Sequence, residues 1–102
     1  LGMLVSLADR YHVRSNRESG YGRYDVMLIP HDTTKVGIVI EFKKVDIYEH
    51  ETLEQAAANA LVQIKDKQYV QEMHALGISS TVLVGIAFEG KKVLIQYEHL
   101  KA

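Results

Sequence analysis

Two acids and one lysine in this sequence have the types and spacing of a hydrolytic site. Glu41 and Lys43 are two positions apart, and Asp25 precedes them in the chain. Carboxylates are hard oxygen ligands that suit Mg²⁺ or Mn²⁺. A lysine beside them can hold a water molecule and neutralise charge on a phosphate oxygen. Together these three side chains could perform metal-assisted hydrolysis of a phosphodiester.

Two neighbouring strands are needed to position these side chains. Residues 36–43, VGIVIEFK, alternate with period two and are apolar on both faces, which predicts a strand inside the sheet. Glu41 and Lys43 then project from the same face. Residues 23–29 predict a second strand, separated from the first by a short turn. Antiparallel pairing of these strands brings Asp25 near Glu41.

The other segments place this pair of strands within an α-β-β-β-α-β-β order. Residues 1–10 have apolar spacing typical of a helix and lack an N-cap, so we expect the chain to be the C-terminal part of a longer protein. Thr52 and Gln55 can form a capping box that begins a helix, which should run to about residue 75, and Gly77 should end it. Strands are also predicted at residues 11–16, 80–88 and 93–97.

This order predicts one three-layer α/β/α domain over residues 1–102. Because a strand–helix–strand connection normally makes a parallel pair, the later helix should cover one face of the sheet and the first helix the other. The three alanines at residues 56–58 suit close approach to the sheet. We expect a mixed sheet of about five strands.

Composition limits the classes of protein that are possible. The chain contains no cysteine, which excludes disulfides and thiolate zinc sites. Its apolar runs are far shorter than the roughly 18 residues of a membrane span. No signal peptide is visible, so we expect a cytoplasmic location without a membrane partner. The formal net charge of −1 argues against nucleic-acid binding by bulk charge alone, although all four arginines lie before residue 25 and can form a local basic patch.

Three longer motifs resemble one known family. They are SNRESGYGRYD at residues 15–25, ALVQI at residues 60–64 and GIAFEGK at residues 85–91. With Asp25 and the Glu41-Phe42-Lys43 triple, they resemble the PD-(D/E)XK nuclease superfamily. Within it, the chain is similar to the nuclease-like C-terminal domain of predicted AAA-ATPase-like bacterial proteins. The resemblance covers nearly the whole chain, from Leu4 to about Tyr97, and the stretch RESGYGRYD at residues 17–25 is its specific part.

The resemblance implies a restriction-endonuclease-like fold and Mg²⁺- or Mn²⁺-dependent cleavage of DNA. Asp25, Glu41 and the backbone carbonyl of Phe42 would be metal ligands, and Lys43 would be the catalytic lysine. Gln63 would be the polar catalytic residue of the following helix. Further candidates are Glu18 as a metal ligand and, for nucleic-acid contact, Arg14, Arg17, Arg23 and Lys67. On a continuous helix, Lys67 and Gln63 would be neighbours and Tyr69 would lie on a different face.

Alternatives remain for both the residues and the function. Tyr24 stands where the superfamily motif has proline, and the visible part of the first helix offers only Asp9 as an acid. Glu41 and Lys43 could instead form a solvated pair, and Glu18 could be a turn residue. The domain could also keep the nuclease fold without catalysis and serve a binding or regulatory role beside an AAA-ATPase-like domain. RNA or a nucleotide as substrate is not separable from DNA by sequence.

Overall fold

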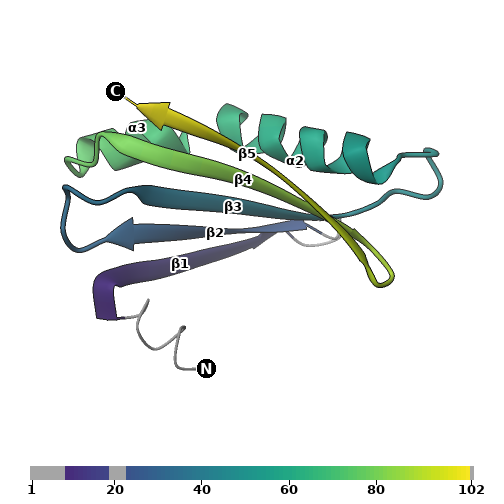
Figure 1. The fold of residues 1–102 in the computed structure, drawn as a ribbon, viewed down its shortest axis with the longest axis horizontal. Coiled ribbons are helices and arrows are strands. Elements are labelled where there is room, and N and C mark those ends of the chain that lie inside the picture. The colour runs from purple at the N-terminus through teal and green to yellow at the C-terminus, as the bar shows by residue number, and fades with distance from the viewer. Residues whose placement is uncertain (1–8, 19–22, 102) are drawn as a thin grey trace.

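Five strands form one mixed sheet in the computed structural model, which describes residues 9–18 and 23–101 (Figure 1). The strand order is β1-β2-β3-β4-β5. The bounds are β1 Tyr11–Glu18, β2 Arg23–Pro30, β3 Gly37–Lys44, β4 Ser80–Glu89 and β5 Lys92–Lys101. Only β3 and β4 pair in parallel; the other neighbours are antiparallel. The apolar segment that contains Glu41 is therefore the central strand, as predicted.

Two helices form the connection between the parallel strands. Helix α2 spans Leu53–Asp66 and α3 spans Tyr69–Ala75. Helix α2 packs on β3, β4 and β5 (Figure 1). This arrangement confirms the predicted α/β class and the parallel pair. The helix expected to cover the other face falls on residues 1–10, of which only Asp9 and Arg10 are described, and both are helical.

The predicted single helix from residue 52 to about residue 75 is wrong, because it breaks in two. Gln68 adopts the left-handed conformation, with φ 60° and ψ 29°. A residue with these angles cannot continue a right-handed helix. Helix α2 therefore ends with the amide of Lys67 donating to the carbonyls of Gln63 and Ile64, and α3 restarts at Tyr69 in a new direction.

Small residues allow α2 to lie close to the sheet. Of the three alanines predicted to approach the sheet, Ala56 and Ala57 are fully buried and Ala58 is only partly buried; Ala60, one turn further on, is also fully buried. On β4, a Cβ at Gly85 would lie 2.6 Å from the carbonyl oxygen of Ala57. A side chain at this position would push the helix away from the strand. Close packing here fixes the height of α2 above the face that carries Glu41.

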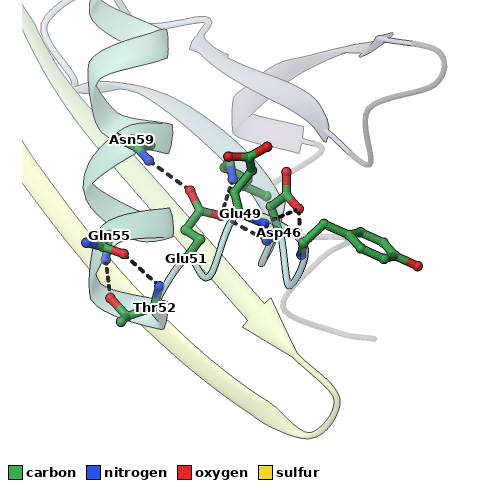
Figure 2. Close-up of polar contacts among 8 residues, drawn as sticks. Asp46, Glu49, Glu51, Thr52, Gln55 and Asn59 are labelled. Carbon is green, nitrogen blue, oxygen red and sulfur yellow. Dashed lines mark hydrogen bonds and ion pairs between the residues drawn. The ribbon is translucent and has the colours of Figure 1, made fainter.

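The ends of the helices follow the predicted capping chemistry. The Thr52 hydroxyl accepts from the Gln55 amide at 3.1 Å, and the Gln55 side chain accepts from the Thr52 amide at 2.9 Å (Figure 2). Gly77, at φ 87°, ends α3 with its amide donating to His74. In the described part of the chain, neither helix is long and apolar enough to cross a membrane.

Candidate active site

Asp25 and Glu41 face each other across β2 and β3. The antiparallel register pairs the two residues directly, as predicted. Both lie on the face of the sheet that α2 covers, and their exposed fractions are 2% and 0%. Two adjacent buried carboxylates repel one another unless a cation lies between them. The geometry of this pair therefore demands a counter-charge.

Lys67 supplies a positive charge to both acids. Its Nζ donates to Asp25 Oδ2 at 2.9 Å and to Glu41 Oε1 at 3.2 Å. The lysine reaches the pair from the C-terminal end of α2, and its side chain remains 22% exposed. One ammonium group thus bridges the two carboxylates that were predicted to bind metal.

Tyr69 completes the contacts on Asp25. Its hydroxyl donates to Asp25 Oδ2 at 2.7 Å. Burial, together with this hydrogen bond, raises the pKa of Tyr69 to about 12, so the phenol keeps its proton at neutral pH. The prediction that Tyr69 lies on a different face from Lys67 is wrong. The left-handed turn at Gln68 redirects the chain, so both side chains converge on the same carboxylate.

Lys43 lies in a second polar cluster on the same face of the sheet. Its Nζ donates to Glu51 Oε1 at 2.5 Å, and the side chains of this ion pair are only 8% and 10% exposed. The amide of Asp46 donates to the same oxygen at 2.9 Å, while Asn59 donates to Glu51 Oε2 at 2.8 Å (Figure 2). Glu51 is therefore the residue that orients the proposed catalytic lysine.

The local contacts of Glu51 keep it ionised. Burial alone raises the pKa of its carboxyl, but the hydrogen bonds from Lys43, the Asp46 amide and Asn59 outweigh burial and bring the pKa below its usual value. The loop that carries Glu51 is itself ordered, because Asp46 Oδ1 accepts from the amides of Tyr48 and Glu49 at 3.1 and 3.3 Å. Lys43 consequently has a fixed anionic partner at neutral pH.

A pocket of about 330 Å³ opens beside this cluster. Lys43 and Gln63 both line it, so the structure brings these two predicted residues together. The lining also contains the acids Asp46, Glu49 and Glu51. A phosphate entering from this side would meet more negative than positive charge, and Lys43 is the basic residue that could offset it.

The predicted arginines and Glu18 lie on β1 and β2. Arg14, on β1, donates to Glu72 at 2.6 Å, and both side chains are about half exposed. Arg17, Arg23 and Glu18 occupy strand positions at the ends of β1 and β2, but their side chains lie outside the described part. Arg14 therefore has an internal anionic partner. A nucleic-acid phosphate would have to compete with Glu72 for the Arg14 guanidinium group.

The sequence did not predict Glu51 or Tyr69, nor the contacts that Asp46 and Asn59 make with Glu51. Glu51 comes just before the N-cap Thr52, and an acid at the end of a strand-to-helix loop is the signal that could have suggested it. Tyr69 gave no such signal, because its approach to Asp25 depends on the break after α2. Lys67 was predicted to contact nucleic acid, yet it lies between the two carboxylates.

The donor set fits a magnesium-type ion that keeps several waters. Among the described residues, no group of three or more histidine, cysteine, aspartate or glutamate side chains gathers to hold a metal. Asp25 and Glu41 provide two hard oxygens, and Mg²⁺ commonly binds through one or two carboxylates plus water and substrate phosphate. The bridging position of Lys67 shows that a cation can be accommodated between them.

A pair of acids on adjacent strands with a lysine two residues after the second acid is the arrangement of a PD-(D/E)XK nuclease-type domain. A family model described as the PD-(D/E)XK nuclease superfamily matches residues 1–98. The chain therefore belongs to this superfamily, and the mixed sheet with its helices agrees with a restriction-endonuclease-like α/β fold. Neither the curated proteins nor the solved structures gave a match.

Proposed function

We propose that this domain hydrolyses phosphodiester bonds of DNA with Mg²⁺ or Mn²⁺ as cofactor. The single observation that carries this proposal is the direct pairing of two buried acids, Asp25 and Glu41, around one cationic group. A structural ion pair has no need for two facing carboxylates, whereas Mg²⁺ commonly binds through one or two carboxylates together with water and substrate phosphate. Membership of the nuclease superfamily supports a nucleic acid as the substrate.

Different residues would bind the metal and contact the attacking water. Asp25, Glu41 and the carbonyl of Phe42 would hold the metal. When bound, the metal would lower the pKa of a coordinated water and neutralise charge on the phosphate. Lys43 would donate hydrogen bonds to the attacking water and to a phosphate oxygen, with Glu51 holding its ammonium group in place.

Other side chains would bind the substrate. Gln63 lines the same pocket as Lys43 and would bind water or phosphate there. Arg14, Arg17 and Arg23 would contact DNA phosphates. Because the net charge of the chain is −1, its attraction to DNA would have to come from such a local group of basic residues. Glu18 would be a further metal ligand beside Asp25. RNA or a nucleotide would be cut by the same chemistry, so the assay includes both.

The test is cleavage by the purified domain. Supercoiled plasmid, single-stranded DNA, RNA and a nucleotide are incubated with Mg²⁺ or Mn²⁺, with EDTA as the metal-free control. We expect cleavage of DNA that EDTA abolishes and that Lys43→Ala slows by about 10²-fold or more. Lys44→Ala is the matched control, because Lys44 is the exposed neighbour on the same strand. Intact DNA with the parent protein, or equal rates for Lys43→Ala and the parent, contradicts the proposal.

A second candidate function is a non-catalytic nuclease-fold domain that acts in binding or regulation beside an AAA-ATPase-like domain. One observation favours it: both lysines of the site already have internal anionic partners, Lys67 with the acid pair and Lys43 with Glu51. Calorimetric titration with Mn²⁺ separates the two functions. Binding that disappears in Asp25→Asn counts against the non-catalytic role, while absence of binding to the parent supports it.

A further inference from the structure

We propose that Lys67 is a built-in counter-cation that occupies the metal position between Asp25 and Glu41, and that its ammonium group leaves when a divalent ion binds. This inference deepens the proposed function, because it concerns regulation of the same site. Lys67 would thus stabilise the metal-free acid pair and set the metal concentration at which the ion binds there.

The contacts of Lys67 support this role. Its Nζ lies within hydrogen-bond distance of one oxygen from each acid, at 2.9 and 3.2 Å. The two acids are essentially inaccessible to solvent, so they depend on a protein cation when no metal is present. A divalent ion would require the same carboxylate oxygens. Two cations that share the same two oxygens at such short range repel each other, so metal and ammonium compete for the site.

The position of Lys67 in the fold allows the ammonium to move while the backbone stays fixed. The residue caps α2, and its amide donates to Gln63 and Ile64 at 3.2 Å each. Its side chain is a flexible four-carbon stem that remains 22% exposed. A rotation of this stem toward solvent therefore needs no change in the helix. Tyr69 would still donate to Asp25 after the ammonium had left.

Substitutions of Lys67 should change the affinity of the acid pair for a divalent ion in a direction that depends on whether the positive charge is kept. In Lys67→Met the stem length is kept but the competing charge is lost, so the acid pair should bind a divalent ion more tightly. In Lys67→Arg the charge is kept, so affinity should stay at or below that of the parent. Lys65→Met is the matched control, because Lys65 lies on the same helix and pairs with Glu98 on β5 instead.

The experiment measures the dissociation constant of Mn²⁺ at pH 8 for these four proteins, with the free ion quantified by electron paramagnetic resonance. We expect Lys67→Met to bind Mn²⁺ about tenfold more tightly than the parent, which corresponds to about 1.4 kcal/mol. Lys65→Met should match the parent within about twofold. The same or weaker affinity in Lys67→Met would overturn the inference.

Thermal unfolding with and without Mn²⁺ is a second measurement, and it separates a change in metal affinity from a loss of stability in the variant. The thermal midpoint of metal-free Lys67→Met should be lower than that of the parent, and saturating Mn²⁺ should raise it by more than it raises the parent. Lys67→Gln, which can still donate a hydrogen bond, provides a milder variant in which the same larger shift is expected. An Mn²⁺-induced shift no larger than that of the parent in both variants contradicts a competing role for Lys67.

The outcomes separate this inference from the nuclease function. If the parent cuts DNA but Lys67→Met binds Mn²⁺ no more tightly, the inference fails and the proposed function stands. If Lys67→Met binds Mn²⁺ more tightly but the parent leaves DNA intact, the inference stands and the proposed function fails. If neither the parent nor the variant binds Mn²⁺, both fail.

Discussion

The hydroxyl of Tyr69 donates a 2.7 Å hydrogen bond to Asp25, a residue 44 positions earlier in the chain. Lys67 donates to the same carboxylate oxygen, Oδ2, at 2.9 Å. Both donors flank Gln68, whose left-handed backbone aims them at one point. The junction between α2 and α3 is therefore part of the site, and it controls which donors the first acid has.

Tyr69→Phe should destabilise the protein while leaving its fold intact. The substitution removes a hydrogen bond to a buried carboxylate, and bonds to charged groups contribute about 1.5–3 kcal/mol. We expect a loss of about 2 kcal/mol in the free energy of unfolding by urea. Tyr97→Phe is the control, because Tyr97 is 72% exposed on β5 and should change stability by less than about 0.5 kcal/mol. Equal stabilities for the two variants would show that the contact at Asp25 contributes nothing.

Glu51 should make stability depend on pH in the acidic range. Its pKa in the folded protein is below the ordinary value of 4.5, so the unfolded chain binds the proton more readily. The contribution of Glu51 is therefore complete above the ordinary pKa and is lost as the pH falls through the folded-state pKa. We expect Glu51→Gln to lower the free energy of unfolding by about 2 kcal/mol at pH 7, and by less at an acidic pH well below the ordinary pKa of 4.5.

Urea unfolding of the parent and Glu51→Gln at both pH values checks this prediction. Glu49→Gln is the control, because Glu49 is exposed in the same loop and should show a small difference at either pH. A constant difference between the parent and Glu51→Gln across the pH range would mean that the Glu51 carboxylate does not stabilise the folded state through its charge.

Gly85→Ala should loosen the packing of α2 on the sheet. The added Cβ would lie 2.6 Å from the Ala57 carbonyl oxygen and 3.0 Å from the Leu61 amide nitrogen, and both are backbone atoms. Such overpacking costs about 1–3 kcal/mol. Thermal unfolding measures this loss. Gly90→Asn is the control, since Gly90 lies in an open turn with φ 58° that asparagine tolerates, and its loss should stay below about 1 kcal/mol.

Local patterns in the sequence were sufficient to predict most of the fold. Period-two alternation placed the strands, and the short turn between residues 30 and 36 brought Asp25 opposite Glu41. The Thr52 and Gln55 pair marked the start of α2, and Gly77 marked the end of α3. Each of these signals acts within a few residues of the structure that it specifies. For that reason the acid pair was predictable.

The contacts around the acid pair were not predictable in this way. The apolar spacing of α2 stops at Ile64, because residues 65–68 are all polar, but a run of polar residues does not by itself specify a left-handed residue at Gln68. Glutamine has no intrinsic preference for the left-handed conformation, and tertiary packing must hold it there. The positions of Lys67 and Tyr69 follow from that break. The partner of Lys43 likewise depends on how the loop before α2 folds back over β3.

The position of bound Mn²⁺ in a crystal decides whether Asp25 and Glu41 are the metal ligands of this domain. Crystals of the domain soaked with Mn²⁺ should give an anomalous difference peak between Asp25 and Glu41, about 2.1–2.2 Å from a carboxylate oxygen of each. The Lys67 ammonium should have moved out of that position, and Lys43 should lie beside the bound water. A peak elsewhere, or no peak between the two acids at saturating Mn²⁺, would contradict the assignment of this pair as the metal site of a nuclease.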